Sequence, residues 1–313
     1  MLAVTDIRVA ENELRAMQSL ASAVWTNAPP LLNSEATLGQ LAWHYGRNRA
    51  RSAARWKAVL IDDGEALAAW GWMNPSEEIT LSATRKAVAD TSLSWQAIPN
   101  RQDALALVLE WFDGSLGDVP RMTTARAHDN GARDVLRSHG YVEDTTAPWS
   151  MLNIRDLASL EPPRSPEGYR LTTMAALGDV SARVAAHRAA WESDLDVAVF
   201  GDVVSTWPYR GDLDVVAVAP DGSVACSVIA WIDAEGAVGE LEPVGTVPAH
   251  RRLGLARAAS TFALHLLRDA GAGHALVSCR GDDDYPVPRK LYGSIGFRPL
   301  AADVVYRKAG ADS

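Results

Sequence analysis

Arg251-Arg252-Leu253-Gly254-Leu255-Ala256 is the stretch that decides how this sequence folds. It stands between a β-rich run, 238–247, and an apolar-periodic run, 255–270, so it predicts a turn from a strand into a helix. Gly271 stands where a left-handed helix cap is expected. The basic and small residues of the turn would let backbone N–H groups at the helix N-terminus approach an anion closely. The apolar positions that share one face of the helix are 255, 258, 259, 262, 263 and 266.

The segments around this turn predict a mixed α/β order. Two β-rich runs, 213–218 and 224–231, flank Pro220-Asp221-Gly222, whose backbone preferences suit the tight turn of a hairpin. A short strand at 169–171 and a helix at 175–191 precede this hairpin. The turn and its helix are followed by a strand at 275–279, a short helix at 287–294 and a last strand at 304–306.

The first half of the chain repeats this order in weaker form. It reads as a hairpin (57–61 and 66–72), a strand (93–98), a helix (103–112), a strand (122–125) and a helix–glycine–aromatic segment (130–141). Three prolines in 158–168 predict a linker. The expected fold class is therefore α/β (α+β): a tandem repeat of domains at 1–157 and 169–313, each a mixed, mostly antiparallel sheet flanked by helices.

Composition narrows the possible partners of this 313-residue chain. The formal net charge of −9 provides no broad basic surface, so we expect neither nucleic acid nor an anionic membrane as the main partner. The start shows no basic and apolar leader, which favours a cytoplasmic protein. Cys226 and Cys279 are too few for a disulfide framework or a metal site and are expected to be buried thiols. A homodimer remains possible.

Three ordered motifs resemble those of the GNAT superfamily of N-acetyltransferases. Arg251, Gly254 and Ala256 match the phosphate-binding motif of that family, 243–248 resembles its fourth strand, and 291–297 resembles its closing helix with a tyrosine. The resemblance implies acetyl-CoA as cofactor, and the layout resembles that of the tandem-domain type, the mycothiol synthases among them. The expected cofactor-binding residues are Val244, Thr246, Arg251, Arg252, Leu253, Gly254, Leu255, Ala256 and Arg257.

The strand that precedes the turn carries two unusual residues. Pro243 cannot donate a ladder hydrogen bond and Gly245 weakens a strand, so the segment predicts a bulge or a strand splayed from its neighbour. The family resemblance implies that such a gap accepts the pantetheine arm. Val244 and Thr246 are then the candidates for the backbone contacts to it.

Acetyl transfer from a thioester to an amine needs a base for the amine and an acid for the departing thiolate. The resemblance implies Glu240 as general base and Tyr292 as general acid, without a covalent intermediate. Glu242 shares the strand face of Glu240, so we expect one of the two carboxyl groups to have a raised pKa. Glu242 is the expected binder of the substrate ammonium, or an alternate base.

An acidic loop follows the predicted strand at 275–279. Together with Glu242, the residues Arg280, Asp282 and Asp284 are the candidates for binding the substrate, and the acidic loop predicts a cationic one. The expected acceptor is the primary amine of a small molecule, such as an amino sugar, an aminoglycoside-like or peptide-like antibiotic, or a thiol precursor. Two alternatives remain: an acyl-CoA sensor without turnover, and a protein N-terminal acetyltransferase.

The first half lacks the equivalent of the phosphate turn. Residues 95–105 pass from strand to helix without a glycine, and Leu136 stands where the second half has Tyr292. We therefore expect a degenerate first domain that packs against or shapes the substrate site, and one acetyl-CoA per chain, in the C-terminal domain.

Overall fold

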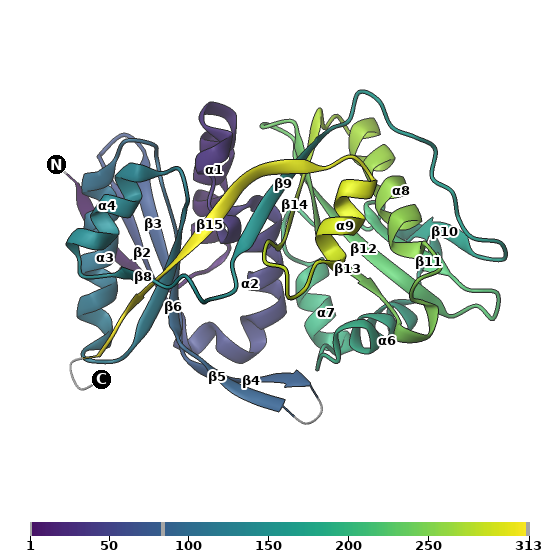
Figure 1. Cartoon of the computed structure of the whole chain (residues 1–313), viewed down its shortest axis with the longest axis horizontal. Coiled ribbons are helices and arrows are strands. Elements are labelled where there is room, and N and C mark those ends of the chain that lie inside the picture. Colours follow the sequence, from purple (N-terminus) through teal and green to yellow (C-terminus); the bar gives the residue numbers. More distant parts are fainter. Residues whose placement is uncertain (1, 83–84, 311–313) are drawn as a thin grey trace.

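The computed structural model describes residues 2–82 and 85–310, and these form a thirteen-stranded mixed sheet that runs through both halves of the chain (Figure 1). Twelve of its strands follow the order β1-β2-β3-β6-β7-β15-β9-β14-β13-β12-β11-β10, and β8 pairs with β15 beside this path. Strands β4 and β5 form a separate hairpin. The central strands of the path come from distant parts of the sequence.

The first half contributes nine strands and four α-helices to the described chain. The strands are β1 (Ala3–Ile7), β2 (Lys57–Asp62), β3 (Leu67–Asn74), β4 (Glu77–Ser82), β5 (Arg85–Ala89), β6 (Thr91–Ala97), β7 (Arg121–Arg126), β8 (Val142–Glu143) and β9 (Ser150–Asp156). The helices are α1 (Glu11–Asn27), α2 (Leu38–Ser52), α3 (Gln102–Leu116) and α4 (Asn130–Ser138), with single 3₁₀ turns η1 (Pro29–Leu31), η2 (Ser34–Ala36) and η3 (Ala53–Arg55).

The second half, within the described residues, contributes six strands and five α-helices. The strands are β10 (Arg170–Thr173), β11 (Asp214–Val218), β12 (Val224–Asp233), β13 (Val238–Thr246), β14 (His274–Arg280) and β15 (Arg298–Lys308). The helices are α5 (Met174–Leu177), α6 (Val180–Trp191), α7 (Val197–Val204), α8 (Leu255–Asp269) and α9 (Val287–Ser294), with a 3₁₀ turn η4 (Pro248–His250).

The two halves share one order of elements, as a tandem repeat predicts. In the first half β2, β3 and β6 are antiparallel neighbours, and α3 leads from β6 to the parallel strand β7. In the second half β11, β12 and β13 are antiparallel, and α8 leads from β13 to the parallel strand β14. Each half is therefore a mixed sheet of the same topology with a helical crossover before its parallel strand.

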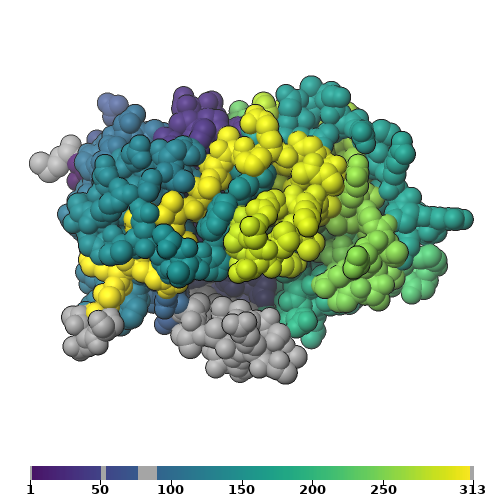
Figure 2. Space-filling model, in the orientation of Figure 1, coloured from purple at the N-terminus to yellow at the C-terminus, as the bar shows by residue number. Residues whose placement is uncertain are grey.

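The halves exchange their last strands. Strand β9 ends the first half in sequence, yet it pairs along its whole length with β14 of the second half. Strand β15 ends the second half, yet its C-terminal residues pair with β7 of the first half, while its N-terminal residues pair with β9. In Figure 2, β15 crosses the front face from one half to the other as a yellow band. The sheet is therefore continuous because each half completes the other.

A buried ion pair lies at this crossing. Asp303 of β15 stands opposite Arg126 of β7, and the Arg126 guanidinium donates to Asp303 Oδ1 at 2.7 Å, with both side chains almost fully buried. Ser34 donates to the other carboxylate oxygen of Asp303 at 2.6 Å. Because a buried charge without its partner is strongly destabilising, these bonds favour the exchanged arrangement over the alternatives.

Helices cover both faces of the second-half sheet. Helix α8 packs on β11, β12 and β13 over the largest apolar cluster, which includes Leu241 and Leu264. The opposite face is covered by α2, α6 and α7, which bury Ile229 and Trp231 of β12. Because α2 belongs to the first half, this core is shared between the halves. Within the described residues, no helix is both long and apolar enough to cross a membrane.

The structure corrects three details of the predicted elements. The helix expected at 175–191 is two helices, α5 and α6, because Gly178 between them takes a left-handed φ of +71°. The buried face of α8 is rotated toward Ser260, Leu264 and Leu267, whereas the predicted positions 262 and 266 are only partly buried. The sequence interpretation missed several elements, namely the strands β1, β4, β5, β8 and β9 and the helices α1, α2 and α7.

Candidate active site

Strand β13 leaves its neighbour β14 halfway along its length. The two strands pair in parallel only from Val238 to Glu240. Beyond that point the register between β13 and β12 shifts, because Val244 stands opposite Val228 whereas Leu241 stands opposite Ala230. The predicted bulge and splay around Pro243 are thereby confirmed. The edge of β13 that faces β14 has no ladder partner in the paired segments described for residues 241–246.

The Arg251–Ala256 turn leads directly into α8. Arg252 and Gly254 have positive φ angles of +65° and +84°, and Gly254 is the residue that precedes the first helical turn. No side chain in the described ranges caps this helix end, and residues 251–254 are exposed. The first backbone N–H groups of α8 therefore remain directed at solvent, where an anionic group can accept from them.

The basic side chains of the turn have different partners. Arg251 donates to the backbone oxygens of Thr246 at 3.2 Å and Ala190 at 3.0 Å, so it ties the end of β13 to α6. Arg257 lies 3.8 Å from Glu161 in an exposed ion pair. Arg252 is exposed and has no ion pair with any described residue. Among the three arginines, Arg252 is therefore the most available to a diphosphate.

Glu242 lies where β13 bulges. Its side chain is half-buried, and burial, followed by the charge of Glu240, raises its pKa to about 8. The Trp231 indole nitrogen donates to the Glu242 backbone oxygen at 2.6 Å and holds the bulge in place. The raised pKa was expected from two neighbouring carboxylates, but desolvation contributes more than their repulsion does.

The carboxyl group of Glu240 accepts hydrogen bonds from the first half of the chain. The Thr37 hydroxyl donates to its Oε1 at 2.6 Å and the Gly39 N–H donates to its Oε2 at 2.8 Å. The Thr37 oxygen also accepts from the Gln40 N–H, so the carboxyl group of Glu240 lies against the N-terminus of α2. Burial raises the pKa of Glu240 to about 7 despite these donors. Both carboxyl oxygens have partners, whereas no described residue donates a hydrogen bond to the Glu242 carboxyl group.

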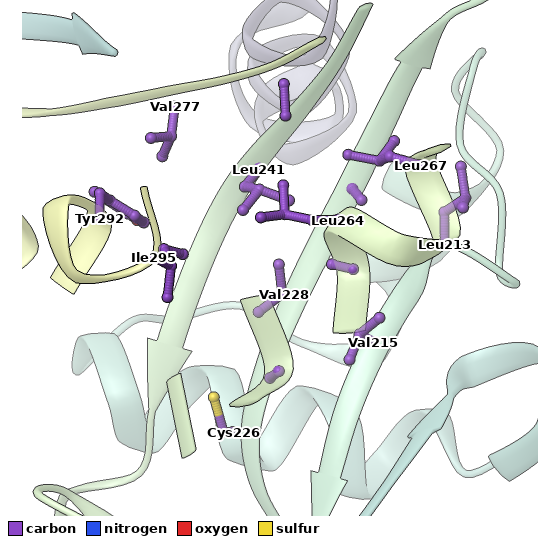
Figure 3. Packing of buried hydrophobic residues seen from close by; sticks show 14 of the residues in the cluster. Leu213, Val215, Cys226, Val228, Leu241, Leu264, Leu267, Val277, Tyr292 and Ile295 are labelled. Atoms are coloured by element: carbon purple, nitrogen blue, oxygen red, sulfur yellow. The ribbon is translucent and has the colours of Figure 1, made fainter. Parts of the chain in front are cut away.

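Tyr292 of α9 lies in the main core of the second half. It is 6% exposed, packs edge-on against Phe297 with ring centroids 5.8 Å apart, and shares a cluster with Leu241, Val277 and Ile295 (Figure 3). Burial raises its pKa, and the charge of Glu242 adds to the rise. Burial and the charge of Glu242 therefore both favour the protonated phenol of Tyr292.

The acidic loop after β14 is largely neutralised by its own arginines. Arg280 donates to both carboxylate oxygens of Asp282 at 2.5 and 2.7 Å, and Arg289 pairs with Asp283 at 2.5 Å. Asp284 is exposed, as is Tyr285. The internal ion pairs weaken the expectation that this loop attracts a cation.

The corresponding turn of the first half is built differently. Asn100 takes a positive φ of +67°, and the following residue, Arg101, is bonded to Asp63 at 3.1 Å and to Asp103 at 2.9 Å. The one basic side chain at this helix start is thus already paired.

Sequence reasoning missed Thr37 and Gly39, which lie over 200 residues from Glu240. No local motif marks them.

Comparison with known proteins finds a family model that matches part of the second half. Residues 185–297 match the model of the acetyltransferase (GNAT) family. A stretch of 79 residues, 25% of this chain, is 37% identical to a mycothiol acetyltransferase of Nocardia farcinica (strain IFM 10152). The match spans only a quarter of that curated relative's length.

Solved structures resemble the whole chain. A GCN5-related N-acetyltransferase from Sphaerobacter thermophilus has a TM-score of 0.62 at 16% identity, over 97% of this chain and 95% of that one. A tandem GNAT protein from the clavulanic acid biosynthesis pathway has a TM-score of 0.58 at 13% identity, over 98% of both chains. At such identities the likeness shows the shared fold.

Gly39 provides a test of the contact between α2 and β13. A Cβ atom at this position would lie 2.5 Å from both Glu240 Oε2 and Trp231 Cδ1, so Gly39→Ala should lower the free energy of unfolding by roughly 1–3 kcal/mol through overpacking. The measurement is urea denaturation followed by tryptophan fluorescence.

The matched control is Gly114→Ala, an exposed position of α3 where a Cβ meets nothing within 4 Å. That substitution should slightly raise the free energy of unfolding, because alanine has a higher helix propensity than glycine. Equal stability of the Gly39→Ala protein and the native chain would contradict the close contact.

Proposed function

We propose that the protein transfers an acetyl group from acetyl-CoA to the primary amine of a small molecule, because residues 185–297 match the model of the acetyltransferase (GNAT) family and the whole chain has the fold of a tandem GNAT protein. The observation that carries this proposal is the Glu242 carboxyl group, unpaired in the described chain and with a pKa near 8, beside the splayed end of β13. In this proposal residues 169–313 are catalytic, and residues 1–157 support and shape the site.

The cofactor is proposed to bind at the start of α8. Acetyl-CoA, when bound, supplies the acetyl group as a thioester. The uncapped N–H groups after Gly254 and the Arg252 side chain would hold its diphosphate, since a Cβ-free residue at +84° lets the backbone approach an anion. The edge of β13 at Val244 and at the Thr246 N–H would hold the pantetheine amides, beside the Thr246 carbonyl oxygen that accepts from Arg251. These residues fit acetyl-CoA, because the backbone N–H groups and the Arg252 guanidinium can donate hydrogen bonds to the negatively charged diphosphate.

Glu242 is the better candidate for the general base. A base must reach the amine proton and be partly ionised near neutral pH, and a pKa near 8 meets the second condition. Glu240, the residue first expected in this role, already accepts hydrogen bonds from Thr37 and Gly39. We therefore assign Glu240 to positioning: it fixes β13 against α2, two residues before the base.

Tyr292 is proposed as the general acid. Its phenol is protonated across the neutral range because burial raises its pKa, so it can give a proton to the departing thiolate. The charge of Glu242 adds to this rise in pKa. No covalent enzyme intermediate is needed.

The acceptor is proposed to be a small, cationic amine. The chain carries a net charge of −9, which favours the approach of cations. Release of free thiol from acetyl-CoA across a panel of small amines and N-terminal peptides tests this directly. Thiol release with peptides alone would indicate a protein N-terminal acetyltransferase, and binding of acetyl-CoA without release over the whole panel would indicate a sensor.

Gly254→Asp tests the cofactor site. Aspartate tolerates a positive φ, but its carboxylate at the start of α8 would repel the diphosphate, so the Kd for acetyl-CoA should rise about tenfold or more. Isothermal calorimetry should give one acetyl-CoA per chain.

The control for this variant is Asn100→Asp, which places the same charge at the equivalent helix start of the first half. It should leave the Kd unchanged. Two acetyl-CoA molecules per chain, or weaker binding in Asn100→Asp, would show that the first half also binds the cofactor.

Glu242→Gln tests the base. Since only the carboxylate accepts a proton, kcat of the native protein should rise with pH through about 8, and the variant should lose this rise together with roughly 10²–10⁴ of its turnover. Steady-state kinetics from pH 6 to 10 measure both effects. Glu235→Gln, in the exposed turn between β12 and β13, should behave as the native chain does. If the Glu242→Gln protein kept the rise of kcat with pH, Glu242 would not be the general base.

Tyr292→Phe tests the acid. Loss of the phenolic proton should lower kcat by about 10²-fold, whereas the Kd for acetyl-CoA should stay within a factor of about two, because the ring remains packed on Phe297. The exposed Tyr285→Phe serves as control. An unchanged kcat would remove Tyr292 from the mechanism.

A further inference from the structure

Helix α6 ends in a tryptophan that stays exposed to solvent. Trp191 is the last residue of α6 and is 53% exposed, whereas Trp70 and Trp231 are at most 1% exposed. The proposed cofactor site and the proposed base and acid leave this indole without a role. Its place beside the splayed strand β13 calls for an explanation.

The indole lies directly against the part of β13 that no longer pairs with β14. A Cβ atom on Gly245 would lie 2.7 Å from Trp191 Nε1 and 3.1 Å from Ala190 Cβ, so a glycine is needed for α6 to approach the strand this closely. Arg251 joins the two elements a second time, because it donates to the backbone oxygens of Thr246 and Ala190. The position of Trp191 relative to β13 is therefore fixed at two points.

The proposed base faces the same side of the sheet as this indole. Glu240 contacts the start of α2, and side chains alternate along a strand, so Glu242 points to the face that α2, α6 and α7 cover. After the bulge, Val244 packs against the α8 cluster on the other face, so Gly245 faces α6. The Glu242 carboxyl group and the Trp191 indole therefore flank one stretch of β13 on its α6 side.

A column of rings supports the indole from below. The Trp191 ring lies 6.3 Å from the His187 ring, and the His187 ring lies 5.4 Å from that of Trp43 of α2, measured between centroids. His187 is 4% exposed, and burial, followed by the charges of Arg183 and Arg47, lowers its pKa to about 3. The imidazole is therefore neutral near pH 7, and the column orients the indole without placing a charge beneath it.

The two arginines near this column are paired with carboxylates. Arg183 donates to Asp214 Oδ1 at 3.1 Å, with both side chains fully buried, and Arg47 forms an ion pair with Asp194. Within residues 2–82 and 85–310, by contrast, the Glu242 carboxyl group has no hydrogen-bond donor. Of these charged groups, Glu242 is thus the one that a cation bound beside Trp191 would neutralise.

We propose that the Trp191 indole binds the ammonium form of the acceptor by a cation–π interaction and so places its nitrogen beside Glu242. The proposal rests on the proposed function, since it takes Glu242 as the group that receives the amine proton. An indole face attracts a cation within about 6 Å of the ring centroid, and more strongly than a phenyl ring does. Carboxylate and indole together then select a positively charged amine over a neutral molecule of the same shape.

Trp191→Leu tests the indole with ligands that cannot be acetylated. The ligands are trimethylammonium alcohols, choline the shortest of them, each paired with the neutral alcohol in which a tert-butyl group replaces the trimethylammonium group. Calorimetry on the full chain saturated with CoA should show at least one cation bound more tightly than its neutral counterpart. In Trp191→Leu this preference should fall about threefold to thirtyfold, and Trp191→Phe should keep part of it.

The matched control is Trp207→Leu. Trp207 is 39% exposed, but the Arg15 guanidinium already lies 4.0 Å from its ring centroid, so its face holds a cation of the protein itself. This variant should keep the preference of the native chain. The Kd for acetyl-CoA should stay within a factor of about two in all three variants, since the indole is assigned to the acceptor.

Equal affinity for every pair in the native chain, or a preference unchanged in Trp191→Leu, would overturn the proposal. A higher Kd for acetyl-CoA in Trp191→Leu would also overturn it, because the ring would then serve the cofactor.

Thiol release from acetyl-CoA separates these outcomes from failure of the proposed function. Trp191→Leu should raise KM for the amine and keep the rise of kcat with pH, because Glu242 is intact. Thiol release with a KM that does not depend on Trp191 leaves the function and removes the cation site. A Trp191-dependent preference without thiol release for any amine leaves the cation site and removes the function.

Discussion

Backbone hydrogen bonding between exchanged strands is the constraint on which the rest of this structure depends. β9 fills the place beside β14, and β15 fills the place beside β7, so each half ends in a strand that the other half needs. An unpaired central strand would leave a row of buried N–H and C=O groups without partners, at a high cost in free energy. The two halves therefore form one body, and their relative position is set by strand register rather than by surface contact alone.

That fixed relation gives the two carboxylates of β13 different properties. Glu240 lies where β13 still pairs with β14 and where the N-terminus of α2 reaches the strand, so its oxygens accept from the first half. Glu242 lies past the point of divergence, and its half-buried carboxyl group has no hydrogen-bond donor among residues 2–82 and 85–310. One side chain of the pair joins the two halves, and the other is the proposed general base.

The same geometry changes the expected role of the first half. Sequence alone indicates a degenerate copy that has lost the glycine turn, and the paired Arg101 agrees with this interpretation. Yet α2 from this half covers the sheet of the second half, and Thr37 and Gly39 at its start hold the Glu240 carboxyl group. A half that lacks the glycine turn therefore still fixes the position of β13.

Local patterns predicted much of the fold. The Arg251–Ala256 turn, the helix after it and the bulge at Pro243 depend on the φ preferences of glycine, the missing N–H of proline and apolar periodicity, all of which act over a few residues. The sequence-based predictions failed for elements whose pairing or packing partners lie far away in the sequence. The strand β9 was missed because its pairing with β14 spans more than 100 residues, and α2 was missed although it docks on Glu240.

The sequence by itself determined the repeat of two α/β units, the turn suited to a diphosphate and the residues Glu240, Glu242 and Tyr292 as candidates. Only the tertiary structure decided which strands are exchanged, which carboxylate of β13 is hydrogen-bonded to the first half, and that Arg280 and Arg289 neutralise the acidic loop. The physical reason is that burial and hydrogen-bond partners set the pKa and availability of a side chain. Those partners come from segments that sequence spacing does not bring together.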